Sequence, residues 1–91
     1  MVPIGSMKQF YVNEMEILVV NFNDQIYCLD ARCTHAGAPL AEGTLNGWLL
    51  TCPWHGSQFN VTNGKVLHGP AEKQLKTYPS VVRDGNVFID V

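Results

Sequence analysis

Two short stretches decide how this chain is organised: Cys33-Thr34-His35 and Cys52-Pro53-Trp54-His55. Each places a cysteine and a histidine within a single bend of the backbone. Thiolate sulfur and imidazole nitrogen are ligands of borderline-soft metal ions, and ligands that lie close in sequence cost less entropy to assemble. Residues that allow or impose sharp bends flank both stretches, at Gly37, Pro39, Pro53 and Gly56. The sequence therefore predicts a metal centre held by two tight loops.

The chain around these loops has frequent turn signals and almost no helical periodicity. The Asn-Asp, Asn-Gly and Asp-Gly pairs at 23–24, 46–47, 63–64 and 84–85 tolerate the positive φ angles of tight hairpin turns. Between them, β-branched and aromatic residues predict strands at 16–22, 25–30, 48–51, 57–61, 65–67, 75–82 and 87–91, with a single helical turn at 38–42. Short strands at this spacing indicate an all-β antiparallel sandwich or barrel.

Length and composition narrow the class of protein. The 91 residues, 46% of them apolar, suit one globular domain over 1–91. Pro3 and Gly5 leave open whether residues 1–6 are a natural loop, a non-native remnant or the edge of a larger domain. No apolar run approaches the roughly 18–20 residues that span a bilayer, and the N-terminus does not read as a secretory signal, so we expect a cytoplasmic protein. A formal net charge of −2 without basic clusters makes nucleic acid and membranes poor partners.

The cysteine count favours a metal over disulfides. Three cysteines cannot all pair within one chain, and an odd count with Cys–His spacing favours a reducing compartment. Cys28 alternates with Ile26 on an apolar segment, so we predict that it is a small buried core residue.

Two kinds of metal centre compete for the four ligands. Two cysteines and two histidines form an ordinary tetrahedral zinc set, but zinc fingers usually group their ligands as Cys-x-x-Cys and His-x-x-x-His, with the histidines on a helix. Here each pair is mixed and the scaffold reads as all-β. A two-iron cluster explains the mixing better, because one iron takes both cysteines, the other takes both histidines, and each loop supplies one ligand to each iron. A structural zinc domain that binds a partner stays as the less favoured alternative.

The two stretches, extended to Cys33-Thr34-His35-Ala36-Gly37 and Cys52-Pro53-Trp54-His55-Gly56-Ser57, resemble the cluster-binding boxes of Rieske-type [2Fe–2S] proteins. Gly69-Pro70-Ala71 resembles the proline loop that covers the cluster in that family. The likeness extends over nearly the whole chain from about Val2. It implies one [2Fe–2S] cluster bound by Cys33, His35, Cys52 and His55, with Gly37, Gly69 and Pro70 among the residues around it.

Departures from the family pattern indicate the branch. Ala38 and Trp54 stand where cytochrome bc-type members carry two further cysteines that form a disulfide, so the likeness is to the disulfide-free ferredoxins that serve oxygenases. We expect Trp54 to supply packing between the loops instead. Ser57 retains a hydroxyl that the family places near sulfur, whereas Phe59 stands at a tyrosine position and has no donor. Fewer hydrogen bonds to sulfur predict a potential toward the lower end of the Rieske range of about −150 to +300 mV.

The resemblance implies a monomeric carrier that passes one electron at a time from a reductase to a terminal oxygenase or related enzyme. Catalysis by this chain is not expected: beyond His35 and His55 only His68, predicted to be an ordinary loop residue, could join a two-His-one-carboxylate iron site. No Gly-x-Gly-x-x-Gly fingerprint marks a flavin or nicotinamide site. An alternative keeps the cluster but makes the chain a small subunit or domain of a Rieske oxygenase or nitrite reductase.

Overall fold

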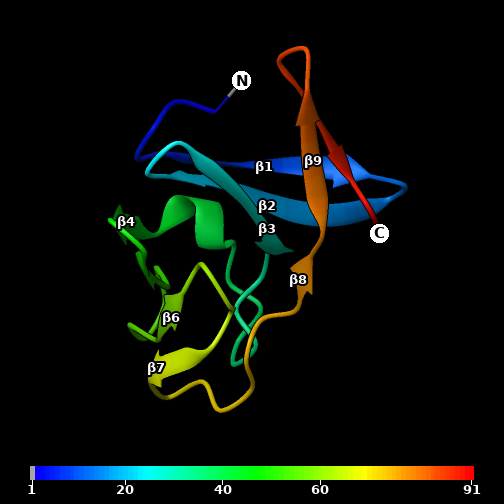
Figure 1. Ribbon diagram of the computed structural model, residues 1–91. Coiled ribbons are helices and arrows are strands. Elements are labelled where there is room, and N and C mark those ends of the chain that lie inside the picture. The colour runs from blue at the N-terminus through cyan, green and yellow to red at the C-terminus, as the bar shows by residue number, and fades with distance from the viewer. Residues whose placement is uncertain (1) are drawn as a thin grey trace.

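The computed structural model describes residues 2–91 and consists of short strands connected by tight turns (Figure 1). The strands are β1 Met7–Val12, β2 Met15–Phe22, β3 Gln25–Asp30, β4 Thr44–Asn46, β5 Leu49–Thr51, β6 Gln58–Asn60, β7 Val66–His68, β8 Thr77–Tyr78, β9 Ser80–Arg83 and β10 Asn86–Ile89, with one 3₁₀ turn, η1, at Leu40–Glu42. All the strand pairings are antiparallel, which confirms the predicted fold class. Within residues 2–91, no helix is long and apolar enough to cross a membrane.

The strands form three antiparallel sheets. One has the order β1-β2-β3-β8, a second has the order β4-β5-β6-β7, and the β9–β10 hairpin forms the third. Figure 1 shows the hairpin crossing beside the first sheet, with the second sheet and the connecting loops at the opposite end of the molecule. The predicted metal loops leave β3 and β5, so they come from different sheets and meet at that opposite end.

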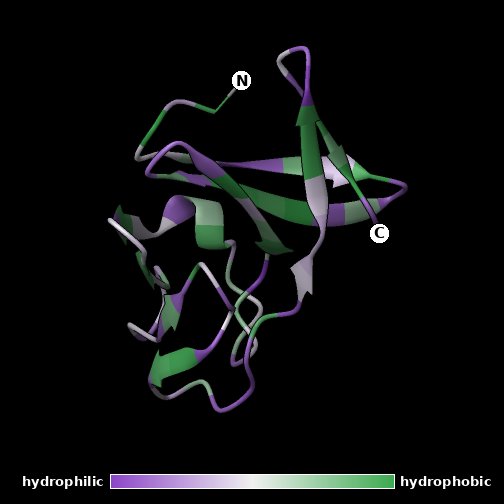
Figure 2. Ribbon diagram, viewed as in Figure 1, coloured by the Kyte–Doolittle hydropathy of each residue, from purple (hydrophilic) through white to green (hydrophobic). Residues whose placement is uncertain are grey.

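Strand β2 is the structural centre because both of its faces are buried. Side chains alternate between the faces of a strand. Ile17 and Val19 accordingly belong to one apolar cluster and Leu18 and Val20 to another. In Figure 2 the middle of β2 is a continuous hydrophobic stretch, whereas the hairpin turns are hydrophilic.

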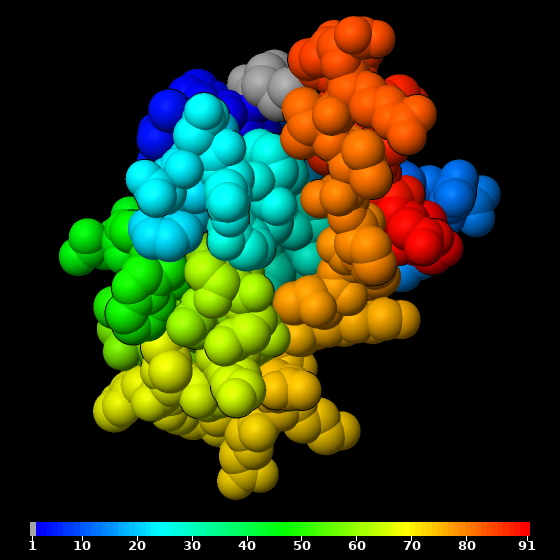
Figure 3. Space-filling model, viewed as in Figure 1, coloured from blue at the N-terminus to red at the C-terminus, as the bar shows by residue number. Residues whose placement is uncertain are grey.

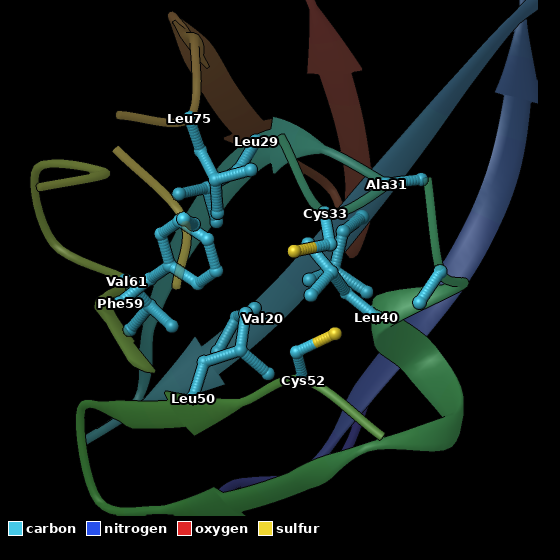
Figure 4. Packing of buried hydrophobic residues seen from close by; sticks show 13 residues of the cluster. Val20, Leu29, Ala31, Cys33, Leu40, Leu50, Cys52, Phe59, Val61 and Leu75 are labelled. Carbon is cyan, nitrogen blue, oxygen red and sulfur yellow. The ribbon is translucent and has the colours of Figure 1, made fainter. Parts of the chain in front are cut away.

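The larger cluster connects the sheets to the metal loops. It joins residues of both four-stranded sheets, such as Leu29, Leu50 and Phe59, and it contains both Cys33 and Cys52 (Figure 4). Phe59 is fully buried there and lies opposite Leu50 in the β5–β6 ladder. Each loop therefore contributes a buried cysteine to the main core.

The predicted turns and strands need four corrections. β1 was not predicted; the Asn13–Glu14 turn that joins it to β2 has φ of 50° and 67°, an unusual conformation for Glu. β4 was also missed, because three residues are too few to show an alternating pattern. The strand predicted at 75–82 is two strands, because Pro79 cannot donate a ladder hydrogen bond. Finally, Trp48 lies in the turn before β5 and is 44% exposed.

Candidate metal centre

The first loop (residues 33–38) follows β3 and is closed by its own backbone. The Cys33 N–H donates to the Ala38 carbonyl over 2.9 Å, and the Gly37 N–H donates to the Cys33 carbonyl over 2.9 Å. Gly37 has φ of +73°, a conformation that a glycine adopts without strain. This turn allows the buried Cys33 and the exposed His35 to lie on opposite sides of one short loop.

The second loop (residues 52–57) joins β5 to β6. The Cys52 N–H donates to the Ser57 carbonyl over 2.8 Å, which closes the loop at its base. His55 and Gly56 follow one another in the left-handed region, with φ of +65° and +75°. A histidine in this region is uncommon, and such residues concentrate at functional sites.

The loops sort their four candidate ligands by chemical type. Cys33 and Cys52 are only 4% and 3% exposed, and Figure 4 shows that they come from opposite sides into the same end of the core. His35 and His55 are exposed, and their ring centroids lie 5.4 Å apart at an interplanar angle of 82°. The site thus has a buried sulfur end and an exposed nitrogen end.

The Cys52 thiol lies in an apolar setting that favours its protonated form. Burial raises the pKa of the Cys52 thiol; a hydrogen bond from the Trp54 backbone lowers it, and the neighbouring Cys33 side chain raises it. A metal held by the Cys52 sulfur would therefore have to displace the thiol proton. A pair of adjacent buried thiols gains most from a cation that neutralises both.

A third segment, residues 69–74, touches both loops. The Ala71 N–H donates to the Ser57 hydroxyl oxygen over 3.0 Å, and the Thr34 hydroxyl donates to the Lys73 carbonyl. The predicted proline loop, Gly69 and Pro70, is exposed beside these contacts. Figure 3 shows this part of the chain, coloured yellow to gold, forming the lower end of the molecule.

The remaining residues singled out from the sequence fall into a buried and an exposed group. Ala38 is fully buried, and so is Ser57, whose oxygen accepts the bond from Ala71. Trp54 is 50% exposed, so half of its surface faces outward instead of packing between the loops as expected. His68 ends β7 and is exposed, so it is a strand residue instead of the predicted loop residue.

Cys28 is the third thiol and lies away from the loops. It is 2% exposed and belongs to the smaller apolar cluster, which confirms the prediction of a core residue. Burial raises its pKa, against a hydrogen bond with Ser80 that lowers it, as expected for an unreactive thiol.

The donor set fits a two-iron cluster better than a single ion. A single zinc needs its donors around one point. Separate thiol and imidazole pairs suit a centre with two metals, one of which takes sulfur and the other nitrogen.

Comparison with known proteins agrees with this geometry. The family model described as the Rieske [2Fe-2S] domain matches residues 1–79. The ferredoxin component of the naphthalene 1,2-dioxygenase/salicylate 5-hydroxylase systems of Ralstonia sp is 35% identical over 88 residues, which is 97% of this chain and 85% of that protein.

Two solved structures extend the likeness to the whole fold. The Sphingomonas yanoikuyae B1 ferredoxin has a TM-score of 0.93 at 33% identity and covers 99% of this chain and 89% of its own. A chain in the complex of reduced oxygenase and oxidized ferredoxin in carbazole 1,9a-dioxygenase has a TM-score of 0.89 at 32% identity, with 97% of this chain and 82% of that chain covered.

The chain belongs to the Rieske [2Fe–2S] domain family. Within that family it is a ferredoxin-type electron carrier with one [2Fe–2S] cluster, and it is not itself a catalyst.

Sequence reasoning missed the side chains that secure the loops. Arg32 precedes Cys33 and bonds the Gly37 carbonyl, while Asp30 accepts hydrogen bonds from the Lys76 N–H and the Tyr78 hydroxyl. Their partners lie 5 to 48 residues away in sequence, so no local spacing reveals them.

Proposed function

We propose that Cys33 and Cys52 bind one iron of the cluster and that His35 and His55 bind the other. The support is the sorting of the four side chains, with buried thiols and exposed, adjacent imidazoles. When bound, the cluster supplies a one-electron redox couple. Of the further residues suggested by the resemblance, Gly37 turns the first loop, Ala38 and Phe59 exclude water from the sulfur end, and Ser57 anchors the segment that carries Gly69 and Pro70.

We further propose that the chain transfers electrons from a reductase to the terminal oxygenase of a dioxygenase system. The Ralstonia relative is named as the ferredoxin component of such systems, and the carbazole dioxygenase structure pairs a similar ferredoxin with its oxygenase. A partner would reach the imidazole end, because His35 and His55 are exposed whereas both thiols are buried.

The surface around the two histidines suits brief docking. Pro53, Trp54 and Pro70 are exposed there, and His35 borders an open hollow of about 400 Å³ that is also lined by Glu72 and Lys73. A small apolar area with one charge of each sign favours a weak, transient interface, as electron carriers need. Binding that is too tight would slow the release of the carrier.

Residues 1–91 are proposed to form a single Rieske domain that works in the cytoplasm. Residues beyond the family match form the β9–β10 hairpin, which completes the fold. Among the described residues, no disulfide joins any of the three cysteines, which suits a reducing compartment.

The cluster is tested by anaerobic purification followed by metal analysis and EPR. We expect two irons and two sulfides per chain, and a reduced-state EPR signal with the low average g value of histidine-ligated clusters. A colourless protein with one zinc would support the structural zinc domain instead.

The ligands are tested by replacing one histidine at a time. His35→Ala and His55→Ala should each abolish that EPR signal, whereas the matched control His68→Ala should keep it. Retention of the native signal in either ligand variant would contradict the assignment of that residue.

A further inference from the structure

Arg32 contacts both strand β2 and the first loop. Its Nε lies 3.1 and 3.2 Å from the two carboxylate oxygens of Glu16, and its Nη2 lies 3.1 Å from Glu16 Oε2. Its Nη1 donates to the Gly37 carbonyl over 2.9 Å. All three guanidinium nitrogens are therefore engaged.

The Glu16 carboxylate that binds Arg32 is itself restrained by a hydrogen bond. Glu16 lies on β2, opposite Tyr11 of β1, and accepts a 2.7 Å hydrogen bond from the Gln9 amide on the same pair of strands. Arg32 donates to the Glu16 carboxylate, and this hydrogen bond, together with the charge of Glu16, raises the pKa of Arg32. This chain of contacts runs from the first sheet to the loop.

This series of contacts ends at the Gly37 peptide and restrains its orientation. The N–H of Gly37 donates to the Cys33 carbonyl, and its carbonyl accepts from Arg32, so both polar groups of the residue are engaged. An antiparallel bridge between Arg32 and Pro39 closes the base of the loop. Gly37 could otherwise rotate freely, since a glycine has the widest conformational range and nothing lies within 4 Å of where its Cβ would be.

A single exposed ion pair contributes little to the free energy of unfolding. Arg32 differs from a simple ion pair because its planar guanidinium bonds a carboxylate and a backbone carbonyl at the same time. The compact ammonium group of a lysine cannot reach both acceptors. Among the described residues, the second loop has no arginine that bonds a loop carbonyl. It is held by the backbone bond at its base, by the Trp54 backbone hydrogen bond to the Cys52 thiol, and by the Ser57 oxygen that accepts from Ala71.

We propose that Arg32 is a positioning residue that ties the Gly37 carbonyl to Glu16 and thereby keeps the first loop in the shape its ligands require. The link to iron retention rests on the proposed ligand roles of Cys33 and His35. The tether itself does not depend on them.

Hydrogen exchange measured by mass spectrometry tests the tether in the holoprotein. The reporting peptide contains Gly37, and a peptide from β2 and β3 serves as the internal reference for folding. We expect Arg32→Gln to speed exchange in the loop about tenfold, as the loss of a charge-assisted hydrogen bond predicts, without changing the reference peptide. Arg32→Lys should give nearly the same increase, because it keeps the charge but loses the fork.

Arg83, at the end of β9, provides the matched control because it is the other arginine of the chain and is exposed. Arg83→Gln should leave the loop peptide unchanged. Unchanged exchange in Arg32→Gln, equal acceleration in Arg83→Gln, or native exchange in Arg32→Lys would each overturn the proposal.

A second experiment measures the rate at which the protein loses iron. Visible absorbance should decay about tenfold faster in Arg32→Gln than in the parent when a chelator is added, the scale expected for residues that orient metal ligands. Equal decay would overturn the link to iron retention. If metal analysis finds no iron at all, the proposed function fails, yet the exchange comparison on the metal-free chain still tests the tether.

Discussion

The two ligand loops are similar in sequence but are held in different ways. Both loops are closed by backbone hydrogen bonds, but the first is also secured by two side chains, because Arg32 bonds Gly37 and Thr34 bonds Lys73. The second loop is secured by its own backbone bond and by the buried Ser57. Each loop supplies one thiol and one imidazole, so the centre depends on both kinds of support. The difference predicts that the loops respond unequally when the centre is disturbed.

Iron removal should have the largest effect on hydrogen exchange in the two loops. Without the family disulfide, the loops depend on the cluster, so exchange in both should rise by on the order of a hundredfold, while β2 and β3 change little. The second loop should rise more than the first, because it lacks the two side-chain tethers. Hydrogen exchange of metal-free and loaded protein measures both. Equal protection with and without iron would contradict the prediction that the loops depend on the cluster. A greater rise in the first loop would contradict the prediction that the second loop is held more weakly.

Ser57→Ala should have the next largest effect. It removes the acceptor of the Ala71 N–H, and leaving a buried donor unsatisfied costs about 1–3 kcal/mol. Denaturant unfolding measures the loss, with Ser6→Ala as a control on a half-exposed serine. A free energy of unfolding equal to that of the parent would show that the second loop does not depend on this serine.

Phe59→Tyr should change the midpoint potential. If the new hydroxyl donates to a cluster sulfur, and this bond is about 1 kcal/mol stronger in the reduced state, the potential rises by about 40 mV. Protein-film voltammetry measures the shift, and Phe88→Tyr, on the exposed side of β10, should leave the potential unchanged. An unaltered midpoint in Phe59→Tyr would show that this position does not face the sulfurs.

Tyr78→Phe should have the smallest effect, seen only at high pH. Burial and the hydrogen bond to Asp30, 2.7 Å long, raise the pKa of Tyr78 to about 12 from 10.0. Since the neutral phenol is favoured in the fold, its contribution to stability is complete below pH 10 and is lost between pH 10 and about 12. Thermal unfolding should show this loss in the parent but not in Tyr78→Phe. Identical curves would contradict it.

The sequence predicted most of the strands and all four candidate ligands because their signals are local. Alternating residues and Asn-Asp or Asp-Gly turns are visible within a few positions, and so is each Cys–His pair. The strand at Gln25–Asp30 was predicted with its observed bounds. The ligand assignment remains a prediction, although the structure places both thiols in one apolar cluster and the two imidazole rings 5.4 Å apart.

What the sequence could not predict depends on distant contacts or unusual backbone. β1 was missed because its turn uses Glu14 at a positive φ angle. The Arg32–Glu16 pair depends on how β2 and β3 align, since Ile17 of β2 pairs with Asp30 of β3. Residues 2–6, left open from sequence, belong to the fold, because Val2 is buried and its carbonyl accepts a hydrogen bond from Asn21.

The most direct test is electron–nuclear double resonance on reduced protein labelled with ¹⁵N-histidine. Two strongly coupled nitrogens should appear and should persist in His68→Gln, which would place His35 and His55 on the reducible iron. A spectrum without strong nitrogen coupling, in a protein that contains iron and sulfide, would contradict a centre with one sulfur end and one nitrogen end.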